Sequence, residues 1–201
     1  MTEIIEPNPL LIEYYSIAKS LFTDFDDKRP EFSDQQEWHY ILSNIEQNIF
    51  LLERFEEKQL LRPTNKIVDC GIGLGTSLYD LYLQSKEITD KKFEFFGIEK
   101  NKHYIDYFRQ NLMNKWCDEL SLIQDDISNQ NYEQYDIIYT YTPYREVNRL
   151  RSFYQKVSDE MKTGSILIEN KSSGLGLHGV MTEISGLRKI PIDEIVVFQK
   201  I

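Results

Sequence analysis

Apolar side chains in the first sixty positions recur at helical spacing. Steps of three and four residues separate them between Pro9 and Phe25, and again from Ser33 to about Leu60. Two amphipathic helices of this length must bury their apolar faces against something larger. We therefore expect residues 1–62 to form a helical N-terminal extension of a main domain at residues 63–201.

After this extension the pattern changes to short apolar runs that alternate with helical segments, which is typical of βαβ units. The predicted strands are 66–70, 93–99, 120–124, 136–140, 165–169, 187–192 and 194–200, and the predicted helices between the first five are 76–85, 102–116 and 147–161. Only Asp193 separates the last two runs, which predicts a tight hairpin. We expect a doubly wound, mainly parallel, seven-stranded α/β sheet with a C-terminal antiparallel hairpin.

Composition and charge narrow the class of protein. A hydrophobic share of 41% and an aromatic share of 13% are those of a folded globular chain, whereas a formal net charge of -10 disfavours a nucleic-acid partner. Cys70 and Cys117 have no histidine at metal-ligand spacing, so we expect reduced thiols and no bound metal. Without a secretory pattern or an apolar run of roughly 18 residues, we expect a cytoplasmic protein with no membrane partner.

A glycine-rich turn follows the first predicted strand. Glycines stand at positions 71, 73 and 75, directly before the helix that begins at Thr76. Glycine lets the backbone turn sharply and lets a ligand approach its amides, and the helix start behind it favours polar groups. A single glycine here would be an ordinary strand-to-helix turn, but three at alternate positions predict a ligand cradle. A dinucleotide fold wants G-x-G-x-x-G, with glycine where Thr76 stands, so a nicotinamide cofactor is disfavoured.

The run Asp69-x-Gly71-x-Gly73-x-Gly75 resembles the first motif of class I S-adenosylmethionine-dependent methyltransferases. The resemblance covers about residues 66–201. It implies a Rossmann-like fold, S-adenosyl-L-methionine as the cofactor, and contacts from the acidic residue and the glycine turn to the methionine end of that cofactor. Cys70 lies within this motif and belongs to the same candidate set.

Two further strand ends fit the resemblance. Glu99 ends the second strand, where the family places an acid that binds the ribose hydroxyls, and Lys100 follows it. The third strand runs into Asp125, Asp126 and Ile127, which resembles the turn that contacts adenine. By that alignment Asp126 accepts from the adenine amino group and Ile127 offers its amide and side chain. Asp125 is a one-residue alternative, and each of these acids could instead be solvated.

The acceptor side is less defined. Thr140, Tyr141 and Tyr144 are the candidate catalytic residues, because they follow the fourth strand, which in this family borders the transferred methyl group. They either line an acceptor pocket or simply pack a loop. Positions 141–144 match only the last two residues of the motif of nucleic-acid amino-methylating enzymes, so that substrate is not carried over.

Other polar residues near this edge have two interpretations each. Metal-dependent O-methyltransferases place an acid after the fourth strand and an Asp-Asn pair after the fifth; Glu169 and Asn170 stand at the second place, but the first ligand is missing. We therefore expect no catalytic magnesium. His178 is either a base or a solvated loop residue. Aromatic residues of the extension either form a lid over the acceptor or pack it onto the sheet; these are Tyr14, Tyr15, Trp38 and Tyr40.

These observations predict a methyltransferase that acts on a small molecule or on a protein side chain. One alternative is a catalytically inactive, methyltransferase-like cofactor-binding or partner subunit, and another is a nucleotide-sugar or nicotinamide enzyme. The sequence indicates neither the acceptor atom nor the oligomeric state.

Overall fold

The computed structural model describes residues 50–111, 120–144, 146–170, 180, 184–192 and 195–201, with residues 9, 10, 12, 13, 16, 17, 19 and 20 of the N-terminal segment. The elements are α2 (Leu51–Glu57), β1 (Thr64–Cys70), α3 (Thr76–Ser85), β2 (Lys92–Glu99), α4 (Lys102–Asn111), β3 (Leu120–Gln124), the 3-10 turn η4 (Ile127–Asn129), β4 (Ile137–Thr140), α5 (Val147–Glu160), β5 (Ile166–Glu169), β6 (Leu187–Ile192) and β7 (Ile195–Lys200).

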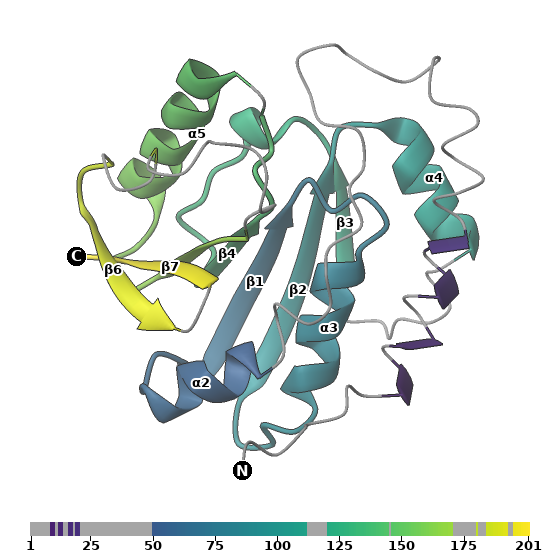
Figure 1. The fold of residues 1–201 in the computed structure, drawn as a ribbon, viewed down its shortest axis with the longest axis horizontal. Helices are drawn as coiled ribbons and strands as arrows, with labels where there is room; N and C mark the ends of the chain where they lie inside the picture. Colours follow the sequence, from purple (N-terminus) through teal and green to yellow (C-terminus); the bar gives the residue numbers. More distant parts are fainter. Residues whose placement is uncertain are drawn as a thin grey trace.

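One seven-stranded sheet forms the centre of the molecule, in the order β3-β2-β1-β4-β5-β7-β6 (Figure 1). The first five strands are parallel, and β7 runs antiparallel to both β5 and β6. This confirms the predicted fold class. The chain reverses its direction of travel across the sheet between β1 and β4, and in open α/β sheets ligands bind at the carboxyl ends of the strands beside such a switch point.

Helices cover both faces of the sheet (Figure 1). Alternate strand residues point to opposite sides, so Ile67 of β1 packs with α2, α3 and α4, while Val68 packs with α5 on the other face. Ile17, from the N-terminal segment, packs against the first of these two cores. The result is a three-layer arrangement in which β1 is buried on both faces.

Most of the predicted element positions agree with the structure. The helices at 76–85 and 147–161 and all seven strands are found within two residues of their expected ends. The described residues between 9 and 20 are helical. The hairpin turn at Asp193, the lid aromatics, His178, Cys117 and the predicted helix beyond residue 111 lie outside the described residues. The domain division at residue 62 stays a prediction.

Gly97 in β2 allows the glycine-rich turn to pack over the sheet. A Cβ atom added at Gly97 would lie 2.3 Å from Cδ1 of Ile72, a residue of that turn. Ile72 is itself only 4% exposed. Because Gly97 has no side chain, Ile72 can pack directly against β2 and hold the turn in place.

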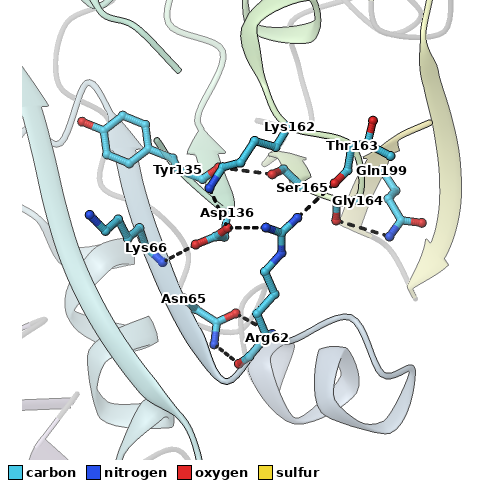
Figure 2. Close-up of polar contacts among 10 residues, drawn as sticks. All are labelled: Arg62, Asn65, Lys66, Tyr135, Asp136, Lys162, Thr163, Gly164, Ser165 and Gln199. Atoms are coloured by element: carbon cyan, nitrogen blue, oxygen red, sulfur yellow. Dashed lines mark hydrogen bonds and ion pairs between the residues drawn. The ribbon is translucent and has the colours of Figure 1, made fainter. Parts of the chain in front are cut away.

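A polar cluster joins the amino ends of β1 and β4 (Figure 2). The Asp136 carboxylate accepts a hydrogen bond from the backbone amide of Lys66 at 2.9 Å. It also pairs with Nη1 of Arg62 at 3.1 Å and with Nζ of Lys162 at 3.2 Å. Arg62 donates further to the carbonyl of Thr163. This cluster joins the segment before β1, the start of β4 and the loop after α5.

We expect Asp136→Ala to lower the free energy of unfolding by about 1–2 kcal/mol. The substitution removes the carboxylate that accepts from one amide and pairs with two cations. Both cations are partly exposed, so solvent screens these ion pairs and their removal costs less. Urea unfolding measures the change. Asp90→Ala is the control, because the Asp90 side chain is 72% exposed. A change at Asp136 no larger than that at Asp90 would contradict a stabilising role.

Candidate functional site

The glycine-rich turn joins the end of β1 to the start of α3 in a conformation that glycine favours. Gly71, Gly73 and Gly75 have φ angles of 85°, 53° and 77°. Residues other than glycine rarely adopt such positive φ angles. The amides of Gly71 and Ile72 donate to the carbonyl of Ile98 at 2.9 and 3.0 Å, which ties the turn to β2. A Cβ atom at Gly71 would meet nothing within 4 Å. The turn is therefore fixed, with open space at Gly71 for a ligand.

Glu99 connects this turn to the neighbouring strand end. Its Oε2 accepts from the amide of Gly73 at 3.1 Å, and its Oε1 accepts from the amide of Asn101 at 2.8 Å. Glu99 is the last residue of β2, and the parallel register brings that end of β2 beside the end of β1. The structure thus brings together Glu99 and the glycine turn, as their positions in the sequence predict.

Asp69 places a second carboxylate at the same edge. It is 4% exposed and lies in register with Tyr139 of β4 and Gly97 of β2. Burial, and to a smaller extent the negative charge of Glu99, raises the pKa of Asp69 from 3.8 to about 8. At neutral pH this pKa leaves Asp69 mostly protonated in the free chain, and a positively charged ligand beside Asp69 and Glu99 would favour its ionised form. The electrostatics therefore favour a cationic ligand over a dinucleotide.

Asp126 begins the 3-10 turn after β3. Its Oδ1 accepts from both the amide and the hydroxyl of Ser128, at 2.9 and 2.8 Å. The Tyr144 phenol donates to the same oxygen at 2.9 Å, while Arg149 and Lys100 approach Oδ2 at 3.4 and 3.7 Å. Burial opposes ionisation, but the hydrogen bonds from Ser128 and Tyr144 and the charge of Lys100 outweigh it and lower the pKa of Asp126. Its carboxylate is thus already surrounded by donors.

Asp125, the alternative to Asp126, is used within the turn itself. Its two oxygens accept from the amide of Asp126, the Asn129 side chain and the Gln130 side chain, at 2.7 to 2.9 Å. The interactions close the turn on itself. Of the two carboxylates, that of Asp126 also contacts side chains beyond the turn, those of Tyr144 and Arg149.

Cys70 supports the adjoining residue Ile127 through a buried tyrosine. The Cys70 thiol donates to the Tyr132 phenol oxygen at 3.6 Å, and that phenol donates to the Ile127 carbonyl at 2.7 Å. Burial raises the pKa of Cys70, which keeps the thiol protonated. Cys70 is therefore a hydrogen-bonded structural link between the glycine turn and η4.

The residues after β4 and β5 form a second polar group. Thr140 is fully buried; its hydroxyl donates to the carbonyl of Ile168 at 3.2 Å and lies 3.3 Å from the phenol oxygen of Tyr154. Tyr154 donates to Oε1 of Glu169 at 3.1 Å, and Glu169 is 3% exposed. The parallel register places Thr140 beside both Cys70 and Glu169. A buried carboxylate thus lies at the same level of the sheet as the glycine turn, two strands away.

Asn170 contacts the opposite face of the sheet. Its side-chain amide donates to the Tyr139 phenol at 2.6 Å, and its backbone amide donates to the carbonyl of Thr140 at 2.9 Å. Tyr141 is half-buried, and burial raises the pKa of its phenol.

Within the described part of the chain, no three His, Cys, Asp or Glu side chains are placed to hold a metal ion. No described helix is both long enough and apolar enough to cross a membrane.

The sequence pattern does not indicate three residues of this site. Tyr132, Arg149 and Tyr154 lie on or before α5 and reach the site only when that helix packs on the sheet. Tyr154 belongs to the apolar face of a predicted helix, so its spacing indicates burial but not its hydrogen bond to Glu169. No local signal marks Tyr132 or Arg149.

Comparisons with solved structures show the fold. A methyltransferase-fold protein of Thermoplasma acidophilum, titled a putative methyltransferase, is 19% identical with a TM-score of 0.51, and the match covers 70% of each chain. An S-adenosylmethionine-dependent methyltransferase of Clostridium acetobutylicum is 17% identical with a TM-score of 0.54, over 91% of this chain and 68% of that one. A class I methyltransferase of Listeria monocytogenes, also titled putative, is 14% identical with a TM-score of 0.55, over 75% of this chain and 58% of that one.

Comparison with family models gives a more specific match. The model described as PRMT5 arginine-N-methyltransferase matches residues 23–141. This range contains the glycine turn, Glu99 and Asp126, and it covers more than half of the chain. It ends at Tyr141, within the loop after β4. No curated protein matches the chain.

Proposed function

We propose that this chain, which belongs to the PRMT5 arginine-N-methyltransferase family, methylates a nitrogen atom of an arginine side chain in a protein or peptide. Family membership makes the chain an S-adenosylmethionine-dependent methyltransferase, with S-adenosylmethionine as its cofactor. The match over residues 23–141 is the observation that carries the arginine acceptor. A small-molecule acceptor is the alternative that the test must separate from it.

The residues at the carboxyl ends of β1, β2 and β3 suit this cofactor. When bound, S-adenosylmethionine supplies a methyl group activated by a sulfonium charge. We propose that Asp69 and the glycine turn hold the methionine end, since the turn has open space at Gly71 and the ammonium group of the ligand would stabilise the ionised form of the buried Asp69. Glu99 would accept from the ribose hydroxyls. The full proposed set also contains Cys70, Gly71, Gly73, Gly75, Lys100, Asp126 and Ile127, in which Cys70 and Asp126 would act by holding the turn that carries Ile127 and not by touching the ligand.

On the acceptor side, Glu169 is the carboxylate that fits a guanidinium. An arginine side chain is always charged and presents a planar set of donors that matches a carboxylate. Glu169 is buried, so its attraction for a cation is less screened than at the surface. Tyr154 orients it through a hydrogen bond of 3.1 Å. We propose that Glu169 binds the guanidinium, with Thr140, Tyr141 and Tyr144 around it.

The N-terminal segment completes the proposal. Ile17 packs against the core under α2, α3 and α4, which supports an extension that lies on this face of the sheet. We propose that residues 1–62 form a helical N-terminal extension of the methyltransferase domain at 63–201 and act as a lid over the acceptor, and that the protein works in the cytoplasm.

The test is methyl transfer from labelled S-adenosylmethionine to arginine-containing peptides, with the same peptides carrying lysine in place of arginine as controls. We expect label in the arginine peptides alone, and at least a tenfold lower rate for Glu169→Gln, which loses the charge that pairs with guanidinium. Label in the lysine peptides or in pools of small molecules would contradict the arginine acceptor. Cofactor binding without transfer to any pool would support the inactive binding subunit instead.

A further inference from the structure

The loop that follows β4 holds a backbone conformation that its own residues disfavour. Thr142 has a φ of 42°, in the left-handed region, and is 4% exposed. A β-branched residue rarely adopts this conformation, and the following Pro143 restricts it further. Such a conformation persists only where the surrounding structure holds it, and it occurs preferentially at functional sites. The structure must therefore contain contacts that hold this loop.

Tyr144 provides the contacts. Its phenol donates to Oδ1 of Asp126 at 2.9 Å, and only 2% of the residue is exposed. The Cζ atom of Arg149 lies 4.0 Å from the centre of the Tyr144 ring, and Phe153 packs against the same ring edge-on at 5.8 Å. Tyr144 is thus fixed by α5 on one side and by the turn after β3 on the other. Only Pro143 separates it from Thr142.

Asp126 is the other half of this contact, and its Oδ1 is fully occupied by donors. A carboxylate has about four lone-pair positions for donors. Two donors of Ser128 and the Tyr144 phenol already converge on Oδ1, and the charges of Arg149 and Lys100 lie near Oδ2. An adenine amino group could therefore reach only Oδ2, where it would compete with Arg149 and Lys100. The geometry favours a role for Asp126 that differs from direct recognition of adenine.

We infer that Asp126 and Tyr144 form a latch, which joins the turn on the cofactor side to the loop on the acceptor side and holds that loop in its strained shape. The inference rests on the proposed function for the placement of cofactor and acceptor. In the latch, Tyr144 is a positioning residue: it sets the path of residues 141–144, which border the acceptor. Asp126 then stabilises the turn after β3 through its hydrogen bonds with Ser128, and it holds the loop after β4 through its charged hydrogen bond with Tyr144.

Tyr144→Phe tests the latch with the smallest change, because the ring keeps its packing on Phe153 and Arg149 and loses only the donor. Asp126→Asn is the second variant, since it removes the charge but keeps the shape. Hydrogen–deuterium exchange of the peptide around residues 141–146 reports on the loop, and calorimetry with S-adenosylhomocysteine reports on the cofactor site. Tyr135→Phe is the matched control: this tyrosine is buried in the same aromatic cluster, and its phenol has no hydrogen-bond partner in normal geometry among the described residues.

We expect both latch variants to exchange about tenfold faster around residues 141–146, the effect of losing one hydrogen bond to a charged group. Exchange in β1 and β2 should stay unchanged, which a general loss of stability would not allow. The dissociation constant for S-adenosylhomocysteine should change by less than about threefold, whereas Tyr135→Phe should alter neither measurement. With an arginine peptide that proves to be a substrate, the latch variants should lower kcat while KM for the cofactor is retained.

Unchanged exchange in both latch variants would overturn the inference. A dissociation constant raised tenfold or more by Asp126→Asn would also overturn it, since the carboxylate would then be a direct ligand of the cofactor. Failure of the proposed function looks different: the wild-type chain would not transfer methyl to arginine, yet the exchange measurements would still decide whether the latch exists.

Discussion

Glu99→Gln is expected to weaken S-adenosylhomocysteine binding by about a hundredfold. The carboxylate would accept two ribose hydroxyls, and hydrogen bonds to a charged group contribute roughly 1.5–3 kcal/mol each. The side-chain amide of glutamine also places an NH2 group against one of the two backbone amides, Gly73 or Asn101, that Glu99 now accepts from. The substitution therefore damages both the ligand contact and the turn that positions it.

Isothermal titration calorimetry measures this loss directly. Glu94→Gln is the matched control, because Glu94 lies on the same strand but its half-exposed side chain pairs with Lys66 at the surface. It should bind S-adenosylhomocysteine as the wild type does. If Glu99→Gln bound within twofold of the wild type, Glu99 could not be the ribose ligand.

Asp69→Asn is expected to change stability and cofactor binding in opposite directions. In the folded chain the pKa of Asp69 is raised from 3.8 to about 8, chiefly by burial and then by Glu99. Folding therefore takes up a proton between about pH 4 and about pH 8, and in this window stability falls as pH rises, by up to about 1.4 kcal/mol per pH unit from this group. Below about pH 4, Asp69 is protonated in both the folded and the unfolded chain and does not change the stability.

Asp69→Asn cannot titrate, so it removes this fall of stability with rising pH. Its free energy of unfolding should fall less steeply than that of the wild type between about pH 5 and about pH 8, measured by urea unfolding without cofactor. Asp80 is also buried, with a pKa raised to about 7, but it is present in both proteins and cancels in the difference. Binding of S-adenosylhomocysteine should weaken at least tenfold, because asparagine cannot ionise to pair with the ammonium group of the methionine end, as Asp69 can when that charge lies beside it.

Asp90→Asn serves as the control for this experiment. Its side chain is 72% exposed, so its pH profile should follow that of the wild type. Parallel profiles for Asp69→Asn and the wild type would mean that Asp69 is not a buried, proton-binding carboxylate. Unchanged cofactor affinity would remove it from the binding site.

Much of the fold could be predicted from local pattern. The strands and helices from 64 to 170 follow from apolar periodicity, and the separation of the last two strands by Asp193 indicates their antiparallel pairing. The glycine turn and Glu99 could also be predicted, since parallel strands bring their carboxyl ends to one edge of the sheet. The hydrogen bond from Gly73 to Glu99 confirms that the two meet.

The sequence by itself determined where the proposed cofactor-binding residues lie: each stands at or next to the end of a strand, and strand ends are visible within about ten residues of chain. Only the tertiary structure decided what Asp126 contacts. Tyr144 and Arg149 reach it from 18 and 23 residues away, and Tyr132 reaches Cys70 across 62. Those contacts depend on how α5 and the loop before it pack on the sheet. Local periodicity predicts that a face of α5 is buried, but not which polar atoms meet beneath it.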